Sequence, residues 1–135
     1  MSNILIVDDQ PNIRKLLTEE LSQEGYQVAG IGDSESVGAS MLNSRPDLVL
    51  LDLYLNGFEG WDILQHIKAK DPNLPVIIIT AYGGYADDPR LSLADGYMVK
   101  NFNHFDALKA KIADILCIER VDKENATVVK KPALQ

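Results

Sequence analysis

The segment PDLVLLD (residues 46–52) gives the clearest indication of how this chain folds. Its four consecutive aliphatic residues, Leu48 to Leu51, follow a proline and precede the turn residues Asn56-Gly57. Such a run is typical of a short strand buried on both faces. A strand of this kind belongs in the centre of a sheet that helices cover, so that only the strand ends meet solvent. Asp52, at the carboxyl end of this strand, is therefore the leading candidate for a functional residue.

Four other segments have the composition of strands, and three of them also end in a polar residue. The segment from 26 to 31 is the weakest, since Gln27 interrupts it, and we expect it near the sheet edge. Helical spacing of apolar residues separates the strands. The strands are predicted at Ile4–Val7, Tyr26–Ile31, Val76–Ile79 and Gly96–Val99. Asp8 and Asp9 follow the first of these strands, Thr80 follows the third, and Lys100 follows the fourth. The helices are predicted from Pro11 to Gly25, from Asp33 or Ser34 to Asn43, from about Glu59 to Lys70, and from near Asn103 onward.

Alternation of strands and helices predicts βαβ units, a parallel sheet and right-handed crossovers. The first, third and fourth strands are the most continuously apolar and should be central. This pattern favours an α/β, flavodoxin-like, doubly wound five-stranded sheet of order 2-1-3-4-5 with helices on both faces. The chain has 135 residues, the size of one domain, which we place at residues 1–119. Residues 120–135 are polar and aperiodic, and we expect a disordered tail there.

Charge and composition limit the possible partners. With 13 basic and 20 acidic side chains, the net charge is −7, which argues against direct binding of nucleic acid. The single cysteine, Cys117, excludes an internal disulfide and fits a reducing compartment. No run approaches the roughly 20 apolar residues of a membrane span, and Met1 leads directly into a strand without a signal sequence. We therefore expect a cytoplasmic protein with no membrane contact.

Polar residues at the strand ends should meet in space. In a parallel sheet all strands point the same way, so Asp8, Asp9, Asp52, Thr80 and Lys100 are expected along one edge. Like-charged carboxylates at about 4 Å cost on the order of 4 kcal/mol per pair at an effective dielectric of about 20. A hard divalent cation such as Mg²⁺ would neutralise them. An aspartate, a divalent metal, a hydroxyl and a lysine together are typical of phosphoryl transfer through an acyl phosphate.

These strand ends resemble those of a known family. The fragments Val7-Asp8-Asp9, Leu50-Leu51-Asp52-Leu53, Ile79-Thr80-Ala81 and Gly96-Tyr97-Met98-Val99-Lys100 resemble the receiver domain of two-component response regulators over roughly residues 2 to 119. The resemblance implies that Asp52 accepts a phosphoryl group from a histidine kinase or a phosphotransfer protein. It also implies that Asp9 binds Mg²⁺ directly, that Asp8 binds it mainly through water, and that Asp52 and the backbone carbonyl of Tyr54 complete the metal site.

The resemblance also implies roles for three further side chains. Lys100 would pair with the phosphoryl oxygens, and Thr80 would turn its hydroxyl toward them. The space that Thr80 leaves would let the ring of Tyr97 turn inward. That movement would shift a two-state surface formed by the fourth helix, the fifth strand and the fifth helix.

The chain departs from the family pattern mildly at Asn56, where proline is usual, and more clearly in two other regions. Asn101 follows Lys100 where the family commonly has proline, so we expect a trans bond and a somewhat relocated lysine. The stretch between Thr80 and Lys100 is about two residues shorter than usual, and Gly83-Gly84 permits only about one or two helical turns around Arg90 to Leu93. A short, displaced or mobile fourth helix would weaken the usual dimer face, so we expect a monomer or a weak dimer.

Two aromatic residues near the site suggest slow hydrolysis. Tyr54 and Tyr82 lie two residues beyond Asp52 and Thr80, where they would flank the path of a hydrolytic water. We therefore predict a long-lived phosphorylated state.

Three classes of function compete. The first is a phosphorylatable receiver without an attached effector, which signals to an unknown downstream protein. The second is a pseudo-receiver that binds proteins without phosphorylation, a possibility that Asn101 and the shortened fourth helix support. The third is an enzyme of the aspartyl-phosphatase kind, which would need a second acid where Tyr54 stands. Because the chain itself is the phosphoryl acceptor, we expect a phosphoprotein that modifies only itself and not an enzyme.

Overall fold

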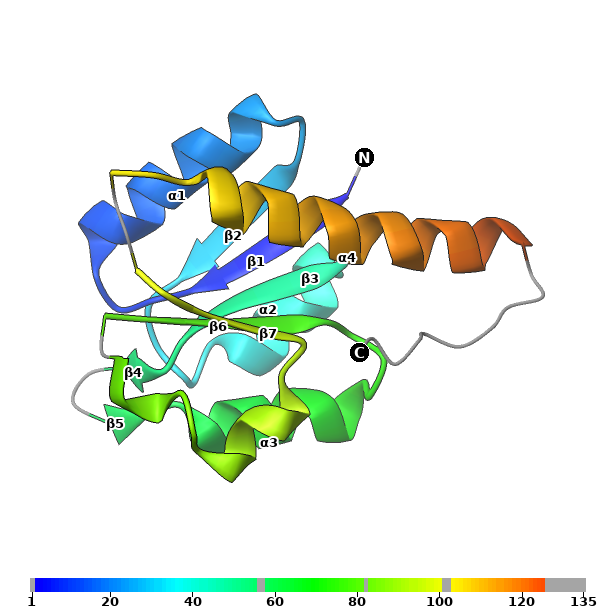
Figure 1. Ribbon diagram of the computed structural model, residues 1–135. Helices are drawn as coiled ribbons and strands as arrows, with labels where there is room; N and C mark the ends of the chain where they lie inside the picture. Colours follow the sequence, from blue (N-terminus) through cyan, green and yellow to red (C-terminus); the bar gives the residue numbers. More distant parts are fainter. Residues whose placement is uncertain (1, 56–57, 82, 101–102, 126–135) are drawn as a thin grey trace.

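A single five-stranded parallel sheet forms the centre of the protein. The computed structural model describes residues 2–55, 58–81, 83–100 and 103–125. The strand order is β2-β1-β3-β6-β7, so β6 and β7 are the fourth and fifth predicted strands and the flavodoxin-like order is confirmed (Figure 1). The strands are β1 (Asn3–Val7), β2 (Gln27–Ile31), β3 (Leu48–Asp52), β6 (Val76–Thr80) and β7 (Gly96–Val99).

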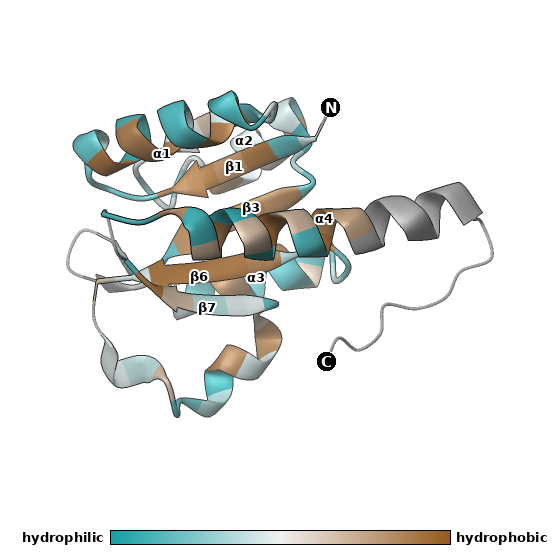
Figure 2. Cartoon of the chain, turned by 45° about the horizontal axis from the view of Figure 1, so that its top comes forward, coloured by the Kyte–Doolittle hydropathy of each residue, from teal (hydrophilic) through white to brown (hydrophobic). Residues whose placement is uncertain are grey.

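The strand that contains Asp52 lies at the centre, as its apolar run predicts. β3 pairs with β1 on one side and with β6 on the other, with Leu51 opposite Val7 and Asp52 opposite Ile79. Every residue of β3 and β6 is buried. The more polar β2 lies at the edge, also as predicted. Figure 2 shows the hydrophobic colouring of β1, β3 and β6 along their length.

Helices cover both faces of the sheet, and the alternation of side chains along each strand produces two separate cores. Leu5, Val49 and Ile78 face one side, where α2 and α3 pack. Ile4, Leu50 and Ile77 face the other side, where α1 and α4 pack (Figure 1). The helices are α1 (Pro11–Gln23), α2 (Val37–Ser44), α3 (Trp61–Lys70) and α4 (Asp106–Asn125).

The helix boundaries follow local signals. Pro11 begins α1, and Gly25 adopts a φ of 95° just beyond its end, which is the left-handed conformation that glycine tolerates best. The Oδ1 atom of Asp33 accepts a hydrogen bond from the N–H of Ser36 at 2.7 Å. The second helix then begins at Val37, slightly later than the predicted cap at Asp33 or Ser34.

Two short 3-10 helices replace the usual fourth helix. They are η1 (Gly83–Tyr85) and η2 (Pro89–Leu93), so the prediction of only one or two turns near Arg90 is confirmed. The guanidinium carbon of Arg90 lies 4.2 Å from the centre of the Trp61 ring on α3. The Tyr85 ring meets Trp61 edge-on, with centroids 5.8 Å apart. These contacts attach η1 and η2 to α3.

The loop after Asp52 and the end of the last helix also differ from the sequence prediction. The loop after Asp52 contains a small antiparallel hairpin, β4 (Tyr54–Leu55) and β5 (Phe58–Glu59). Helix α4 continues to Asn125, past the predicted domain end at residue 119. The prediction followed apolar periodicity, which stops earlier, whereas the charged residues that follow are good helix formers. Residues 126–135 lie outside the described part, so the disordered tail stays a prediction. Among the described helices, none has the length and hydrophobicity that a membrane crossing requires.

Candidate functional site

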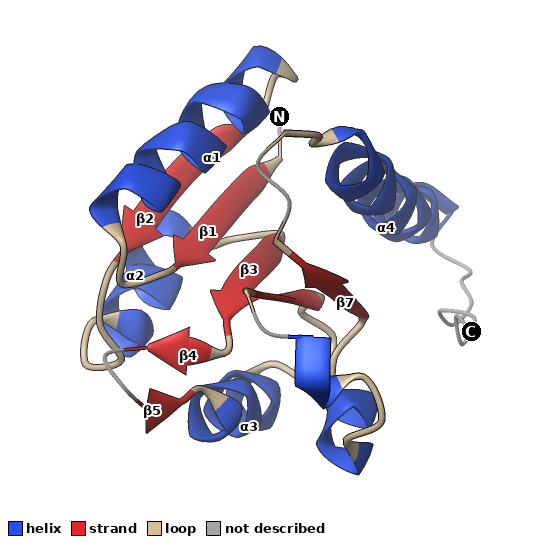
Figure 3. Ribbon diagram, turned by 60° about the vertical axis from the view of Figure 1, so that its left-hand side comes forward, coloured by secondary structure: helices blue, strands red, loops and turns tan. Residues whose placement is uncertain are grey.

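The predicted site residues meet at the carboxyl edge of the sheet. Asp8 and Asp9 follow β1, Asp52 ends β3, Thr80 ends β6 and Lys100 follows β7. The strands are parallel, so their carboxyl ends share this edge (Figure 3). Asp8, Asp52 and Thr80 are buried, whereas Asp9 is partly exposed. The structure thus brings together residues that lie up to about ninety positions apart in the sequence.

Lys100 connects two of the carboxylates. Its Nζ lies 2.8 Å from Oδ2 of Asp8 and 3.1 Å from Oδ2 of Asp52. The three side chains are only 3–5% exposed. The backbone N–H of Lys100 donates to the carbonyl of Thr80 at 2.7 Å, which anchors this residue to the end of β6. Asn101 and its bond to Lys100 lie outside the described residues, so the trans bond stays a prediction.

Backbone amides orient the other oxygen of each buried carboxylate. Oδ1 of Asp8 accepts from the N–H of Gln10 at 2.9 Å, and Oδ1 of Asp52 accepts from the N–H of Tyr54 at 3.1 Å. Each carboxylate therefore contacts an amide through one oxygen and the lysine through the other. This arrangement fixes the direction in which each side chain leaves its strand.

Negative charge predominates at the site, because its carboxylates outnumber the nearby lysine. Burial raises the pKa of the Asp52 carboxyl, and the nearby Asp8 charge raises it further, against the opposing effects of the Tyr54 amide and Lys100. Burial by itself would lower the pKa of Lys100, but the hydrogen bonds and charges of Asp8 and Asp52 outweigh it and raise this pKa. Lys100 therefore stays protonated, and one positive charge faces three carboxylates.

The donor set fits a hard divalent cation. One carboxylate oxygen from each of Asp8, Asp9 and Asp52 can be chosen so that all three lie within 4.8 Å of one another. Oxygen ligands at such spacing suit Mg²⁺, which binds through a few carboxylates and keeps several waters. Whether the backbone carbonyl of Tyr54 is a further ligand stays a prediction.

Two contributors to the site were not identified from the sequence. Nη1 of Arg14 donates to the backbone carbonyl of Asp8 at 2.8 Å. Gly60 packs against the backbone behind Asp52, where a Cβ atom would lie 3.1 Å from the Asp52 carbonyl oxygen. Gly60 falls in the first turn of the helix predicted from about Glu59, where a glycine lowers helix propensity, and this was a usable signal for a close packing contact. No sequence signal distinguished Arg14 from other charged residues of its helix.

The two predicted switch residues lie on the same face of the sheet. Thr80 is fully buried, and Tyr97 on β7 is half-buried against the core formed with α2 and α3. Tyr97 pairs with Ile78, two positions before Thr80. Of the two tyrosines predicted to slow hydrolysis, Tyr54 is 40% exposed and Tyr82 lies outside the described residues, so their effect stays a prediction.

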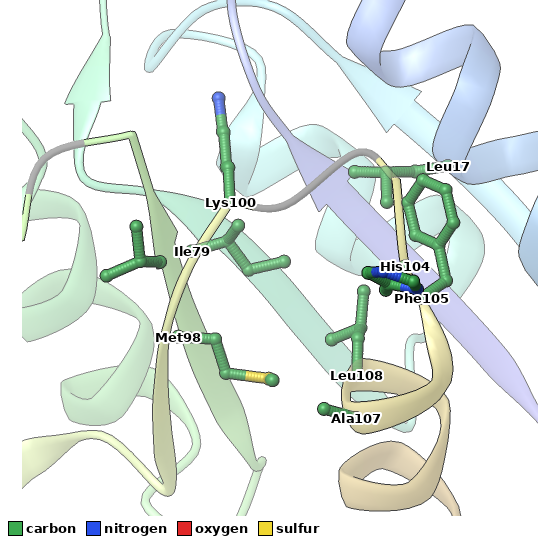
Figure 4. Close-up of a pocket in the computed structure, with 9 residues that line it drawn as sticks. Leu17, Ile79, Met98, Lys100, His104, Phe105, Ala107 and Leu108 are labelled. Atoms are coloured by element: carbon green, nitrogen blue, oxygen red, sulfur yellow. The ribbon is translucent and has the colours of Figure 1, made fainter.

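A separate pocket of about 200 Å³ lies beside Lys100, between α1, α4 and the last two strands (Figure 4). Its walls are mainly apolar, and the amine of Lys100 points away from them. This pocket is therefore distinct from the acidic cluster. Its lining residues include Leu17, Ile79, Met98, Phe105 and Leu108.

Comparison with known sequences gives consistent matches. A family model described as "Response regulator receiver domain" matches residues 4–113. Sporulation initiation phosphotransferase F of Bacillus subtilis is 48% identical over 80 residues, which cover 59% of this chain and 64% of that protein. The probable transcriptional regulator ycf27 of Guillardia theta is 39% identical over 115 residues, covering 84% of this chain and 44% of the relative. The chain thus covers less than two thirds of the length of these curated relatives.

Solved structures also match this chain. TrrA of Thermotoga maritima, crystallised in complex with Mg(2+)-BeF, has 40% sequence identity and a TM-score of 0.79, covering 85% of this chain and 99% of TrrA. A second structure contains TrrA together with the histidine kinase ThkA and has the same identity and TM-score, covering 86% of this chain and 99% of the matched chain.

Proposed function

The chain belongs to the response regulator receiver family, and on this premise we propose that Asp52 accepts a phosphoryl group in a Mg²⁺-dependent reaction. One observation carries the proposal: the Asp52 carboxylate ends the central strand, 3.1 Å from Nζ of Lys100 and within the acidic cluster that includes Asp8 and Asp9. TrrA, which has the same fold, is known in complex with Mg(2+)-BeF, and this supports the assignment.

The reaction uses the side chains that the fold gathers at this edge of the sheet. An oxygen of Asp52 attacks the phosphorus of a phosphohistidine on the donor protein. The bond between phosphorus and the histidine nitrogen breaks as the new O–P bond forms, and the nitrogen keeps the electron pair. The product is an acyl phosphate on Asp52. Lys100 pairs with the phosphoryl oxygens, and the Thr80 hydroxyl donates to them. Asp8, Asp9 and Asp52 would hold Mg²⁺, which supplies positive charge to the transferred oxygens.

The phosphoryl donor is a histidine kinase or a phosphotransfer protein. Support comes from TrrA, which is known in a complex with the histidine kinase ThkA. The chain modifies only itself in this scheme, so it is a phosphoacceptor and not an enzyme with a separate substrate. The net charge of −7 favours a protein as the downstream target over direct contact with nucleic acid, and the single cysteine is typical of a cytoplasmic chain.

Signalling would proceed through Thr80 and Tyr97. A phosphoryl group that attracts the Thr80 hydroxyl changes the packing on the face of the sheet that Tyr97 shares. Tyr97 packs on the same core as Leu91 of η2, so its movement would reach the segment that replaces the fourth helix. The altered segment is consistent with a monomer or a weak dimer.

The alternative functions receive less support. A pseudo-receiver would keep the acidic pocket, but it is not favoured, because Thr80 and Lys100 are also present at this edge and TrrA, 40% identical to this chain, is known in complex with Mg(2+)-BeF. An aspartyl phosphatase would need a second acid two residues after Asp52, where this chain has Tyr54.

Incubation of the protein with Mg²⁺ and a small acyl or amido phosphate donor tests the proposal. Intact-mass spectrometry should detect the added mass of one phosphoryl group, and Asp52→Ala or EDTA should abolish it. Asp62→Ala, which removes an exposed aspartate of α3, is the matched control and should be phosphorylated normally. Absence of the added mass in the wild-type protein, or its persistence in Asp52→Ala, contradicts the proposal.

A further inference from the structure

We propose that Arg14 is a positioning residue, which holds the peptide between the metal-binding residues Asp8 and Asp9, and that Gly32 leaves open the space that the Arg14 guanidinium needs. This inference rests on the proposed function, because it concerns the Mg²⁺ site of the same reaction.

The first step of the argument is the pair of hydrogen bonds on the backbone of Asp8. Its N–H donates to the carbonyl of Ile31 at 3.0 Å, and its carbonyl accepts from Nη1 of Arg14 at 2.8 Å. The carbonyl belongs to the planar peptide unit that joins Asp8 to Asp9. A bond to this oxygen therefore fixes the peptide plane, and with it the direction in which the partly exposed Asp9 side chain leaves the chain.

The second step is the path of the Arg14 side chain. It leaves α1, passes over Gly30 of β2 and reaches Gly32 just beyond that strand. A Cβ on Gly30 would lie 3.4 Å from Cδ of Arg14, an ordinary contact. A Cβ on Gly32 would lie 2.6 Å from Nη1, the atom that donates to Asp8.

The backbone conformation at position 32 does not require a glycine. Among the described residues, Gly25 has the only positive φ recorded for a glycine, so an alanine could adopt the conformation of Gly32. The reason for a glycine there is space for the guanidinium. Because the guanidinium is the far end of a flexible side chain, Gly32→Ala should displace it while the fold remains intact.

If Arg14 acted only through its charge, its removal would change the Mg²⁺ affinity in the opposite direction. A positive charge near Asp8 and Asp9 repels a bound cation, so its removal would tighten Mg²⁺ binding if charge were all that mattered. Loss of positioning weakens Mg²⁺ binding, because groups that orient metal ligands contribute to the affinity. Gly32→Ala keeps the charge and should remove only the hydrogen bond.

Four variants of the full chain test the inference: Arg14→Met, Gly32→Ala, the double variant, and Gly30→Ala as the matched control. Calorimetry should show Mg²⁺ binding about tenfold weaker in Arg14→Met and in Gly32→Ala. The double variant should be no weaker than Arg14→Met, since Gly32→Ala acts through the guanidinium. Gly30→Ala should bind Mg²⁺ like the wild type.

A metal-free measurement separates this inference from the proposed function. The backbone amide resonance of Asp9, recorded in EDTA, should shift in Arg14→Met and Gly32→Ala but not in Gly30→Ala. Failure of the wild type to bind Mg²⁺ would refute the proposed function, whereas an Asp9 resonance unchanged in both variants would refute the positioning role. Tighter Mg²⁺ binding by Arg14→Met would also refute the positioning role. The same holds if Gly32→Ala weakens Mg²⁺ binding as much in the Arg14→Met background as it does in the wild type.

Discussion

Replacement of Lys100 by methionine should destabilise the protein strongly, and Mg²⁺ should reverse part of the loss. Lys100 is the common counter-ion of Asp8 and Asp52, at 2.8 and 3.1 Å, and all three side chains are at most 5% exposed. Without it, two buried carboxylates face each other. Breaking a buried ion pair by removing one partner costs about 3–5 kcal/mol.

The expected magnitude lies at the low end of that range. A pair of like charges at about 4 Å and an effective dielectric of about 20 costs about 4 kcal/mol, and protonation of one carboxyl limits this cost. We therefore expect Lys100→Met to lower the free energy of unfolding by about 3 kcal/mol in EDTA at neutral pH. Mg²⁺ should restore part of it, because the cation binds the folded state more tightly once the competing ammonium is gone.

Urea unfolding in EDTA and in Mg²⁺ measures both effects, with Lys68→Met as the matched control. Nζ of Lys68 lies 2.7 Å from Oδ2 of Asp95, at the opposite end of the sheet, and these side chains are 13% and 18% exposed. Lys68→Met should also destabilise the protein, but by the same amount in EDTA and in Mg²⁺. If Mg²⁺ stabilises Lys100→Met no more than it stabilises the wild type, the reasoning about Lys100 is wrong.

Three further predictions concern the site and its surroundings. Because burial and the charge of Asp8 raise the pKa of Asp52, its ionised form costs stability at neutral pH, and this cost is relieved as the pH falls through the raised pKa. Asp52→Asn in EDTA should therefore raise the urea midpoint at neutral pH, and the gain should vanish toward the ordinary pKa of 3.8; an equal gain at every pH would contradict this. Gly60→Ala places a Cβ 3.1 Å from a backbone oxygen that cannot easily move, so it should lower the free energy of unfolding by about 1–3 kcal/mol. Gly84→Ala, which meets nothing within 4 Å, serves as its control in the same denaturant titration. Arg90→Ala removes the cation above the single tryptophan, Trp61, and should cost about 1 kcal/mol and shift the tryptophan emission to longer wavelength; an unchanged spectrum would show that the contact does not shield the ring.

The position of the site could be predicted from the sequence because it depends on strand direction alone. Four of the five apolar runs end next to a residue that carries chemistry, and parallel strands expose these ends at one edge. Asp52, Asp8 and Lys100 could therefore be placed together without knowledge of any side-chain contact. Helix propensity was also enough to predict that the segment before β7 forms only one or two helical turns, since Gly83-Gly84 opposes a regular helix.

Other features could not be predicted, because they depend on contacts between distant segments. Stacking of Arg90 on Trp61 joins η2 to α3, and neither residue alone indicates the other. The β4–β5 hairpin is too short for a periodic pattern to reveal it. The bond from Arg14 to the Asp8 carbonyl requires α1 to pack against β2 with a glycine at position 32.

The strand order, the central place of residues 48–52 and the edge at which the charged residues emerge could all be predicted from the amino-acid sequence. These properties follow from hydrophobic periodicity and chain direction, which can be determined for each segment of the sequence separately. Which atoms meet at that edge depends on tertiary packing: the ammonium of Lys100 bridges Asp8 and Asp52, and Arg14 from α1 donates a hydrogen bond to the Asp8 carbonyl. Hydrogen bonds and ion pairs require positions accurate to a fraction of an ångström, and packing of the whole chain supplies that accuracy.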